Sequence, residues 1–119
     1  MRMLALLVAL LLPAASAAQE SAVTGTGVML RAVEKISGET TDFTLTRGGQ
    51  ATFGRLSIEM VECRYPSGDP AADAYAYLVM REEGTDAPVF TGWMIASSPA
   101  LNALDHPRYD VWVLRCKTD

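Results

Sequence analysis

Hydrophobic and polar residues alternate along several short stretches of the chain, and turn residues separate these stretches. The clearest alternation lies within residues 56–65, where Leu56, Ile58 and Met60 alternate with Ser57, Glu59 and Val61. A period of two places one set of side chains on a buried face and the other set on the opposite face. This pattern predicts a β-strand over residues 56–65.

Six further stretches have the β-branched and aromatic residues of short strands and are bounded by turn residues. They are residues 28–36, 40–46, 50–53, 74–80, 89–96 and 111–116. The dipeptide Ser37-Gly38 between the first two predicts a β-hairpin. Strands at this spacing predict an all-β domain, a small antiparallel β-sandwich or barrel of about seven strands.

The segment 97–110, between the last two strands, predicts the one short helical turn of the domain. Ser98 is placed to cap a helix, and Pro99 would occupy the first helical position. Leu101 and Leu104 are three residues apart, so both are expected to face the core.

The N-terminus predicts a signal peptide that is removed on export. Arg2 precedes an uninterrupted apolar run over residues 4–12, and the small residues Ala15 and Ala17 follow in the spacing that signal peptidase recognises. The run is about half of the roughly 20 apolar residues that a membrane-spanning helix needs. We therefore expect residues 1–17 to be cleaved rather than to anchor the chain.

Cleavage after Ala17 or Ala18 leaves about 100 residues, the size of one domain. Residues 18–26 are mostly small and polar and predict a flexible lead-in, so the single β domain is expected over 27–119. Loss of Arg2 leaves nine Lys plus Arg against fourteen Asp plus Glu, a net charge of −5. Such a surface repels phosphate backbones, so nucleic acid is not an expected partner.

The exported part retains two cysteines, Cys63 and Cys116. An even count in an oxidising compartment predicts a disulfide, with two buried free thiols as the alternative. The two faces of the strand change character near Val61, which places Cys63 where both faces are covered. No metal is expected, because two Cys and one His lack the close spacing of ligands. No cofactor is expected either.

Several segments of the chain resemble a known protein family. They are residues 53–56 (FGRL), 90–101 (FTGWMIASSPAL) and 106–114 (HPRYDVWVL), together with the two cysteines. They resemble a family of exported alphaproteobacterial proteins that is known only as a domain of unknown function (family 2155). The resemblance covers roughly residues 27–116. It implies a periplasmic location in a Gram-negative bacterium and implies no activity.

The segment from Gly92 to Trp112 concentrates side chains that can bind or react. The candidate binding surface consists of Trp93, Ser98, His106, Tyr109, Asp110 and Trp112. For the two tryptophans core packing is favoured, because each ring would bury a large area. The alternative is an exposed aromatic patch that the tyrosines widen, and such a patch on a rigid β scaffold binds a protein, a peptide or a glycan.

Ser98, His106 and either Asp105 or Asp110 are the residue types of a hydrolase triad. The G-x-S-x-G motif of one large hydrolase class is absent, and a helix cap explains Ser98 without catalysis. His106 precedes Pro107 and is expected to bond to the backbone and fix a turn, and Asp110 is expected to end the loop.

These observations favour a non-enzymatic periplasmic domain that binds another envelope or periplasmic protein, with no membrane insertion after cleavage. A small glycan or ligand binder is the first alternative, and a Ser/His hydrolase is the second. The sequence leaves the oligomeric state open.

Overall fold

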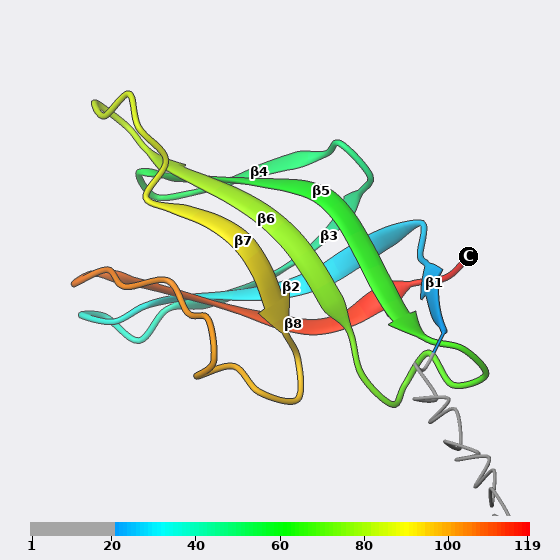
Figure 1. Ribbon diagram of the computed structural model, residues 1–119. Helices are drawn as coiled ribbons and strands as arrows, with labels where there is room; N and C mark the ends of the chain where they lie inside the picture. The colour runs from blue at the N-terminus through cyan, green and yellow to red at the C-terminus, as the bar shows by residue number, and fades with distance from the viewer. Residues whose placement is uncertain (1–20) are drawn as a thin grey trace, which may run out of the picture.

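Eight β-strands and their connecting turns make up residues 21–119, which are the residues that the computed structural model describes (Figure 1). The strands are β1 (Ala22–Thr24), β2 (Gly27–Glu34), β3 (Thr40–Thr46), β4 (Gln50–Phe53), β5 (Leu56–Pro66), β6 (Tyr75–Glu82), β7 (Phe90–Ile95) and β8 (Tyr109–Lys117). This part of the chain contains no helix that could cross a membrane. The predicted signal peptide, residues 1–17, lies outside the described residues.

The strands form two antiparallel sheets that pack face to face as a sandwich (Figure 1). Sheet A has five strands in the order β1-β5-β6-β7, and β4 pairs with the other half of β5 on the same side as β1. Sheet B has three strands in the order β3-β2-β8. The predicted all-β antiparallel fold is confirmed, and each of the seven predicted strands is present. The additional strand, β1, falls within the segment 18–26 that was expected to be a flexible lead-in.

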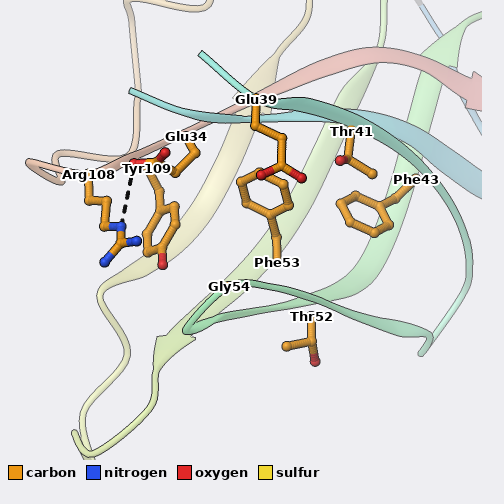
Figure 2. Close-up of a pocket in the computed structure, with 9 residues that line it drawn as sticks. All are labelled: Glu34, Glu39, Thr41, Phe43, Thr52, Phe53, Gly54, Arg108 and Tyr109. Atoms are coloured by element: carbon orange, nitrogen blue, oxygen red, sulfur yellow. Dashed lines mark ion pairs between the residues drawn. The ribbon is translucent and has the colours of Figure 1, made fainter. Parts of the chain in front are cut away.

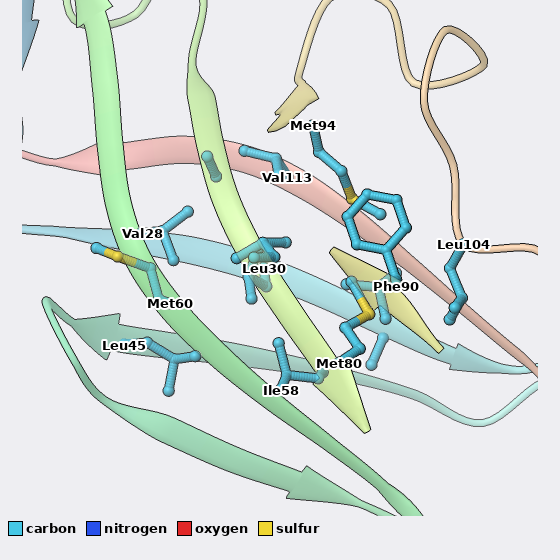
Figure 3. Packing of buried hydrophobic residues seen from close by; sticks show 14 of the residues in the cluster. Val28, Leu30, Leu45, Ile58, Met60, Met80, Phe90, Met94, Leu104 and Val113 are labelled. Atoms are coloured by element: carbon cyan, nitrogen blue, oxygen red, sulfur yellow. The ribbon is translucent and has the colours of Figure 1, made fainter. Parts of the chain in front are cut away.

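Alternation along the strands carries apolar side chains from both sheets into the space between them (Figure 3). The predicted inward row of β5 is buried in full, as is the inward row of β2. The residues labelled in Figure 3 are Val28, Leu30, Leu45, Ile58, Met60, Met80, Phe90, Met94, Leu104 and Val113. Each large aliphatic or aromatic side chain removed from water stabilises the fold by about 1.5–3 kcal/mol.

Two β-bulges turn the cysteines toward each other. The pairing of β5 with β6 skips Val61, and the pairing of β8 with β2 skips Leu114. An extra residue reverses the alternation of side chains beyond it. Cys63 and Cys116 therefore face the interior, where they form the predicted disulfide with Cα atoms 5.7 Å apart. The change of character expected near Val61 is the first of these bulges.

The segment between β7 and β8 is irregular, and the prediction of a helical turn there is wrong. Ser98 N–H donates to the Ile95 carbonyl and Leu101 N–H donates to the Ser98 carbonyl, both at 3.1 Å, which produces separate turns. Leu104 is 4% exposed, whereas Leu101 is 73% exposed. Only one of the two leucines that were expected to face the core does so.

Tertiary hydrogen bonds explain why this segment does not coil. Ser97 donates its backbone N–H and its hydroxyl to the carboxylate of Asp73, at 3.0 and 2.6 Å. Asn102 donates its Nδ2 to the carbonyl of Trp93 at 2.9 Å. A single helical turn has too few internal hydrogen bonds to compete with such anchors. They hold the segment against the start of β6 and the edge of β7 instead.

The double variant Cys63→Ala/Cys116→Ala is expected to lose about 4 kcal/mol of unfolding free energy, because the bond restricts a long loop of the unfolded chain. The two cysteines are 53 residues apart in the sequence. Urea denaturation monitored by circular dichroism measures the loss, and reduction of the wild-type protein should produce a similar one. Unchanged midpoints in both experiments would contradict the expected role of the disulfide.

Candidate functional site

The two tryptophans of the candidate surface lie on opposite sides of the molecule. Trp93 projects from the outer face of sheet A and is 39% exposed, and Trp112 projects from the outer face of sheet B and is 40% exposed. Core packing, which the sequence favoured for both, is wrong. His106 and Tyr109 are buried. The six predicted residues therefore do not form one continuous surface.

Ser98 and Asp110 lie on different elements, and Asp110 is two residues before Trp112 on the outer face of β8. Ser98 is half-buried in the turn after β7, and Asp110 at the start of β8 accepts the N–H of Val111 at 3.0 Å. Among the described residues, no hydrogen bond joins Ser98 to His106, and Asp105 is exposed. The residue types of a triad are present without its geometry. Within residues 21–119, no three His, Cys, Asp or Glu side chains form a group that could hold a metal ion.

Trp93 belongs to a cluster on the outer face of sheet A, which we name the aromatic face and define as Tyr75, Tyr77, Trp93 and Ile95. The register places Tyr77 opposite Trp93 and Tyr75 opposite Ile95. The rings of Tyr77 and Trp93 are 5.3 Å apart in an edge-to-face arrangement, which stabilises such a pair by about 0.5–1.5 kcal/mol beyond its buried area. Sheet A is in front in Figure 1, and no strand or loop of residues 21–119 crosses this face.

Charged residues border the aromatic face on β5. Glu62 lies opposite Tyr77, and Arg64 lies opposite Tyr75. Arg64 Nε is 3.5 Å from Glu62 Oε1, and Thr24 of β1 also donates its hydroxyl to that carboxylate oxygen. An apolar centre with a polar margin is the arrangement of a protein-binding surface.

Trp112 has a different environment. Its partner in the register is Arg31, which forms an ion pair of 2.8 Å with Asp42. Within the described residues no second aromatic ring contacts Trp112. An exposed tryptophan therefore occurs on each sheet, but only Trp93 is part of an aromatic cluster.

An open cleft lies between the two sheets on the side where β3 and β4 run (Figure 2). Its volume is about 410 Å3, and we name it the inter-sheet cleft. Thr41 and Phe43 line it from β3, and Thr52 and Phe53 line it from β4. The other lining residues are Glu34, Glu39, Gly54, Arg108 and Tyr109.

Aromatic rings form the floor of this cleft. Phe53 packs edge to face against Phe43 at 6.2 Å and against Tyr109 at 5.9 Å. The guanidinium of Arg108 lies 5.7 Å from the centre of the Tyr109 ring, a cation–π distance. The phenol oxygen of Tyr109 accepts the N–H of Arg55 at 3.0 Å.

The ring of His106 packs against the ring of Tyr109, with centroids 5.1 Å apart, and both of its nitrogens form hydrogen bonds. Nδ1 accepts the N–H groups of Arg108 and Tyr109, at 3.0 and 3.2 Å. Because Nδ1 accepts, the hydrogen of the neutral ring lies on Nε2, which donates to Glu82 at 3.0 Å. The expectation that His106 fixes a turn through the backbone is confirmed, and the ring has no free nitrogen to activate a nucleophile.

Two carboxylates at the mouth of the cleft differ in their partners. Glu34 accepts the N–H of Ser37 at 2.9 Å and lies 3.5 Å from Arg108, and these contacts, Ser37 first, lower the pKa of Glu34 from its ordinary value. The carboxylate of Glu39 has no hydrogen bond or ion pair within residues 21–119. Glu39 and Phe53 both line the cleft (Figure 2).

The sequence prediction identified Tyr109 but missed the rest of the cleft. Its lining comes from β3, β4 and the ends of β2 and β8, which are far apart along the chain. The tyrosines of the aromatic face were named only as residues that could widen a patch. The register that brings Tyr77 against Trp93 depends on the pairing of β6 with β7, which the alternation of either strand alone does not specify.

Comparison with known proteins covers the part of the chain from β2 to β8. Residues 28–116 match a family described as "Uncharacterized protein conserved in bacteria (DUF2155)". The chain is also 27% identical over 88 residues to the uncharacterized protein RP359 of Rickettsia prowazekii (strain Madrid E). That match covers 71% of this chain and 57% of the Rickettsia protein, so the chain spans little more than half of that relative. No solved structure matches the chain.

Gly54→Ala is expected to destabilise the protein more than Gly48→Ala. Both glycines have a positive φ, 58° and 77°, and a Cβ in that region costs about 1–2 kcal/mol. At Gly54 the Cβ would also lie 2.5 Å from the phenol oxygen of Tyr109, whereas nothing lies within 4 Å at Gly48. Overpacking of this kind adds about 1–3 kcal/mol. Equal losses in urea denaturation would contradict the close packing of Tyr109 against β4.

Proposed function

The chain belongs to the family of uncharacterized proteins conserved in bacteria (DUF2155), and from that premise we propose that it is a non-enzymatic protein-binding module of the periplasm. The observation that carries this proposal is the aromatic face, with Trp93 exposed and held against Tyr77. Its partner is another protein of the periplasm or cell envelope.

The aromatic face has the chemistry of a protein-binding centre. Tryptophan and tyrosine are enriched among the residues that contribute most to binding, and they lie near the middle of interfaces. Tyr77 and Trp93 project from neighbouring, paired strands. Their positions are thus fixed before a partner arrives, so binding loses little conformational freedom. The paired charges of Glu62 and Arg64 supply part of a polar margin.

The disulfide supports an exported location. Cytosolic thiols are kept reduced, whereas structural disulfides persist in oxidising compartments such as the periplasm. Cys63 and Cys116 are buried and bonded to each other. The N-terminal sequence, with its apolar run and small-residue cleavage pattern, is of the kind that directs such export.

The state of His106 favours binding over catalysis. Both ring nitrogens are engaged, by Glu82 on one side and by the backbone of Arg108 and Tyr109 on the other. General-base catalysis at Ser98 needs a nitrogen within hydrogen-bond reach. The histidine serves instead to hold the turn before β8 in place.

Trp93→Ala is expected to weaken binding to the partner at least thirtyfold, because a central aromatic residue contributes about 2 kcal/mol or more. Trp112→Ala is the matched control, since the residue type is the same and the exposed fractions are 39% and 40%. The partner is captured in cells by a photo-crosslinking amino acid at the exposed position Thr91 of β7, with Arg115 of β8 as the control position. Affinities are then measured with the purified pair.

A protein adduct that forms at Thr91, disappears in Trp93→Ala and persists in Trp112→Ala would support the proposal. An adduct of equal yield at Arg115, or one that survives Trp93→Ala, would contradict it. If soluble cell-wall glycan shields the fluorescence of Trp93 from a water-soluble quencher, and no protein adduct forms at Thr91, the domain would be a glycan binder instead.

A further inference from the structure

Strand β3 has an unpaired edge. It pairs with β2 on one side, and sheet B ends there. Two hydrogen bonds that flank this hairpin fix its alternation, from Glu34 N–H to the Glu39 carbonyl at 2.8 Å and from Arg47 N–H to the Thr26 carbonyl at 3.3 Å. Odd-numbered residues of β3 therefore bond to β2, and the even-numbered ones direct their N–H and carbonyl groups away from it.

The edge lacks the features that usually prevent strands from pairing with other chains. Such features are lysine, proline, bulges and covering segments. The sequence of β3 is TTDFTLT, and its pairing with β2 has no bulge. Its one charged residue, Asp42, is occupied by Arg31 at 2.8 and 3.0 Å. Thr40, Asp42 and Thr44 thus present backbone groups that an added strand can bond.

The other sheet has better-protected edges. Along β7, Asn102 donates to the Trp93 carbonyl, and Ser98 N–H donates to the Ile95 carbonyl. On the side of β5 away from β6, the edge strands are β4 and β1, which are only four and three residues long, and such short edge strands offer little to pair with. The other edge of sheet B, β8, has a bulge at Leu114 followed by Arg115 and Lys117, which are features that hinder pairing. The long and regular edge of β3 is therefore the place where an extended segment can join the sandwich.

The inter-sheet cleft lies next to this open edge. Glu39, Thr41 and Phe43 form the inward row of the β2–β3 turn and β3, and all three line the cleft (Figure 2). A strand added beside β3 would continue this row, so its alternate side chains would point between β3 and β4. We propose that β3 accepts an extended peptide segment of a partner protein by strand addition, with alternate side chains in the inter-sheet cleft.

The lining of the cleft specifies the chemistry of that segment. The carboxylate of Glu39 has no partner within the described residues, whereas Glu34 is occupied by Ser37 and Arg108. The rings of Phe43 and Phe53 lie deeper. The bound peptide segment therefore carries a lysine or arginine at the position opposite Glu39. Four positions away, opposite Phe43, it carries an apolar residue.

A second copy of the chain fits this edge less well. Its β3 would bring an acidic residue and threonines rather than a cation, and the chain carries a net charge of −4. Two copies that each carry a net negative charge repel each other. The site is also separate from the aromatic face, which lies on sheet A, so either proposal can fail while the other holds.

The probe is a phage-displayed library of random ten-residue peptides, selected on the purified exported protein. Selected peptides are expected to alternate in polarity, with a basic and an apolar residue four positions apart. Isothermal titration of a synthetic consensus peptide then measures affinity. Thr44→Pro is expected to weaken binding at least tenfold, because it removes an edge N–H without removing a bond to β2. Thr44→Val keeps that N–H and is the control, expected within twofold of wild type.

Two further measurements keep the test independent of the folding of the proline variant. N-methylation of the consensus peptide on the residues that face β3 should abolish binding by the wild-type protein, while N-methylation on the intervening residues should not. Glu39→Gln should weaken the basic peptide about threefold to fivefold, as the loss of one exposed ion pair does.

Selection of no peptide, selection of peptides without alternation, or affinity that neither N-methyl series nor Thr44→Pro changes would overturn the proposal. A concentration-dependent dimer of the purified protein that Thr44→Pro dissociates would assign the edge to a second copy instead.

Discussion

The disulfide between Cys63 and Cys116 joins sheet A to sheet B, and its formation requires a phase shift in both strands that it connects. Each cysteine follows a bulge, at Val61 in β5 and at Leu114 in β8. Because the phase of a strand decides which side chains face the core, the bond is compatible with one arrangement of inward and outward rows. That arrangement buries Tyr109 and exposes Trp112 on the same strand.

Strand β8 connects the two ends of the sandwich. Cys116 closes one end covalently, and Tyr109 closes the other through a hydrogen bond to Arg55 and ring contacts with Phe53 and His106. With both ends fixed, the aromatic face of sheet A and the edge of β3 stay uncovered by the rest of the described chain. Preorganised surfaces on a rigid body support the proposed binding function, and both ring nitrogens of His106 are engaged in hydrogen bonds.

The sequence predicted what depends on local alternation and failed where distant contacts decide. Seven strands and the disulfide followed from period-two patterns and from cysteine usage. The prediction of a helical turn after β7 was wrong because Asp73, which is distant in sequence, holds Ser97 through two hydrogen bonds. The prediction that Trp93 packs in the core was wrong because apolar residues occupy both faces of β7. Alternation alone therefore does not decide which face of this strand is buried. Strand β1 and the cleft were missed because each exists only through pairing between separate segments.

Native-state hydrogen exchange, followed for each amide by NMR, tests the central claim that the ends of the sandwich are closed while the edge of β3 is open. We expect alternation within β3, with slow exchange at Thr41, Phe43 and Leu45 and fast exchange at Thr40, Asp42 and Thr44. Slow exchange at all of these amides would mean that another segment already covers the edge. Fast exchange at all of them would mean that β3 is not held by β2. Either result would contradict the account.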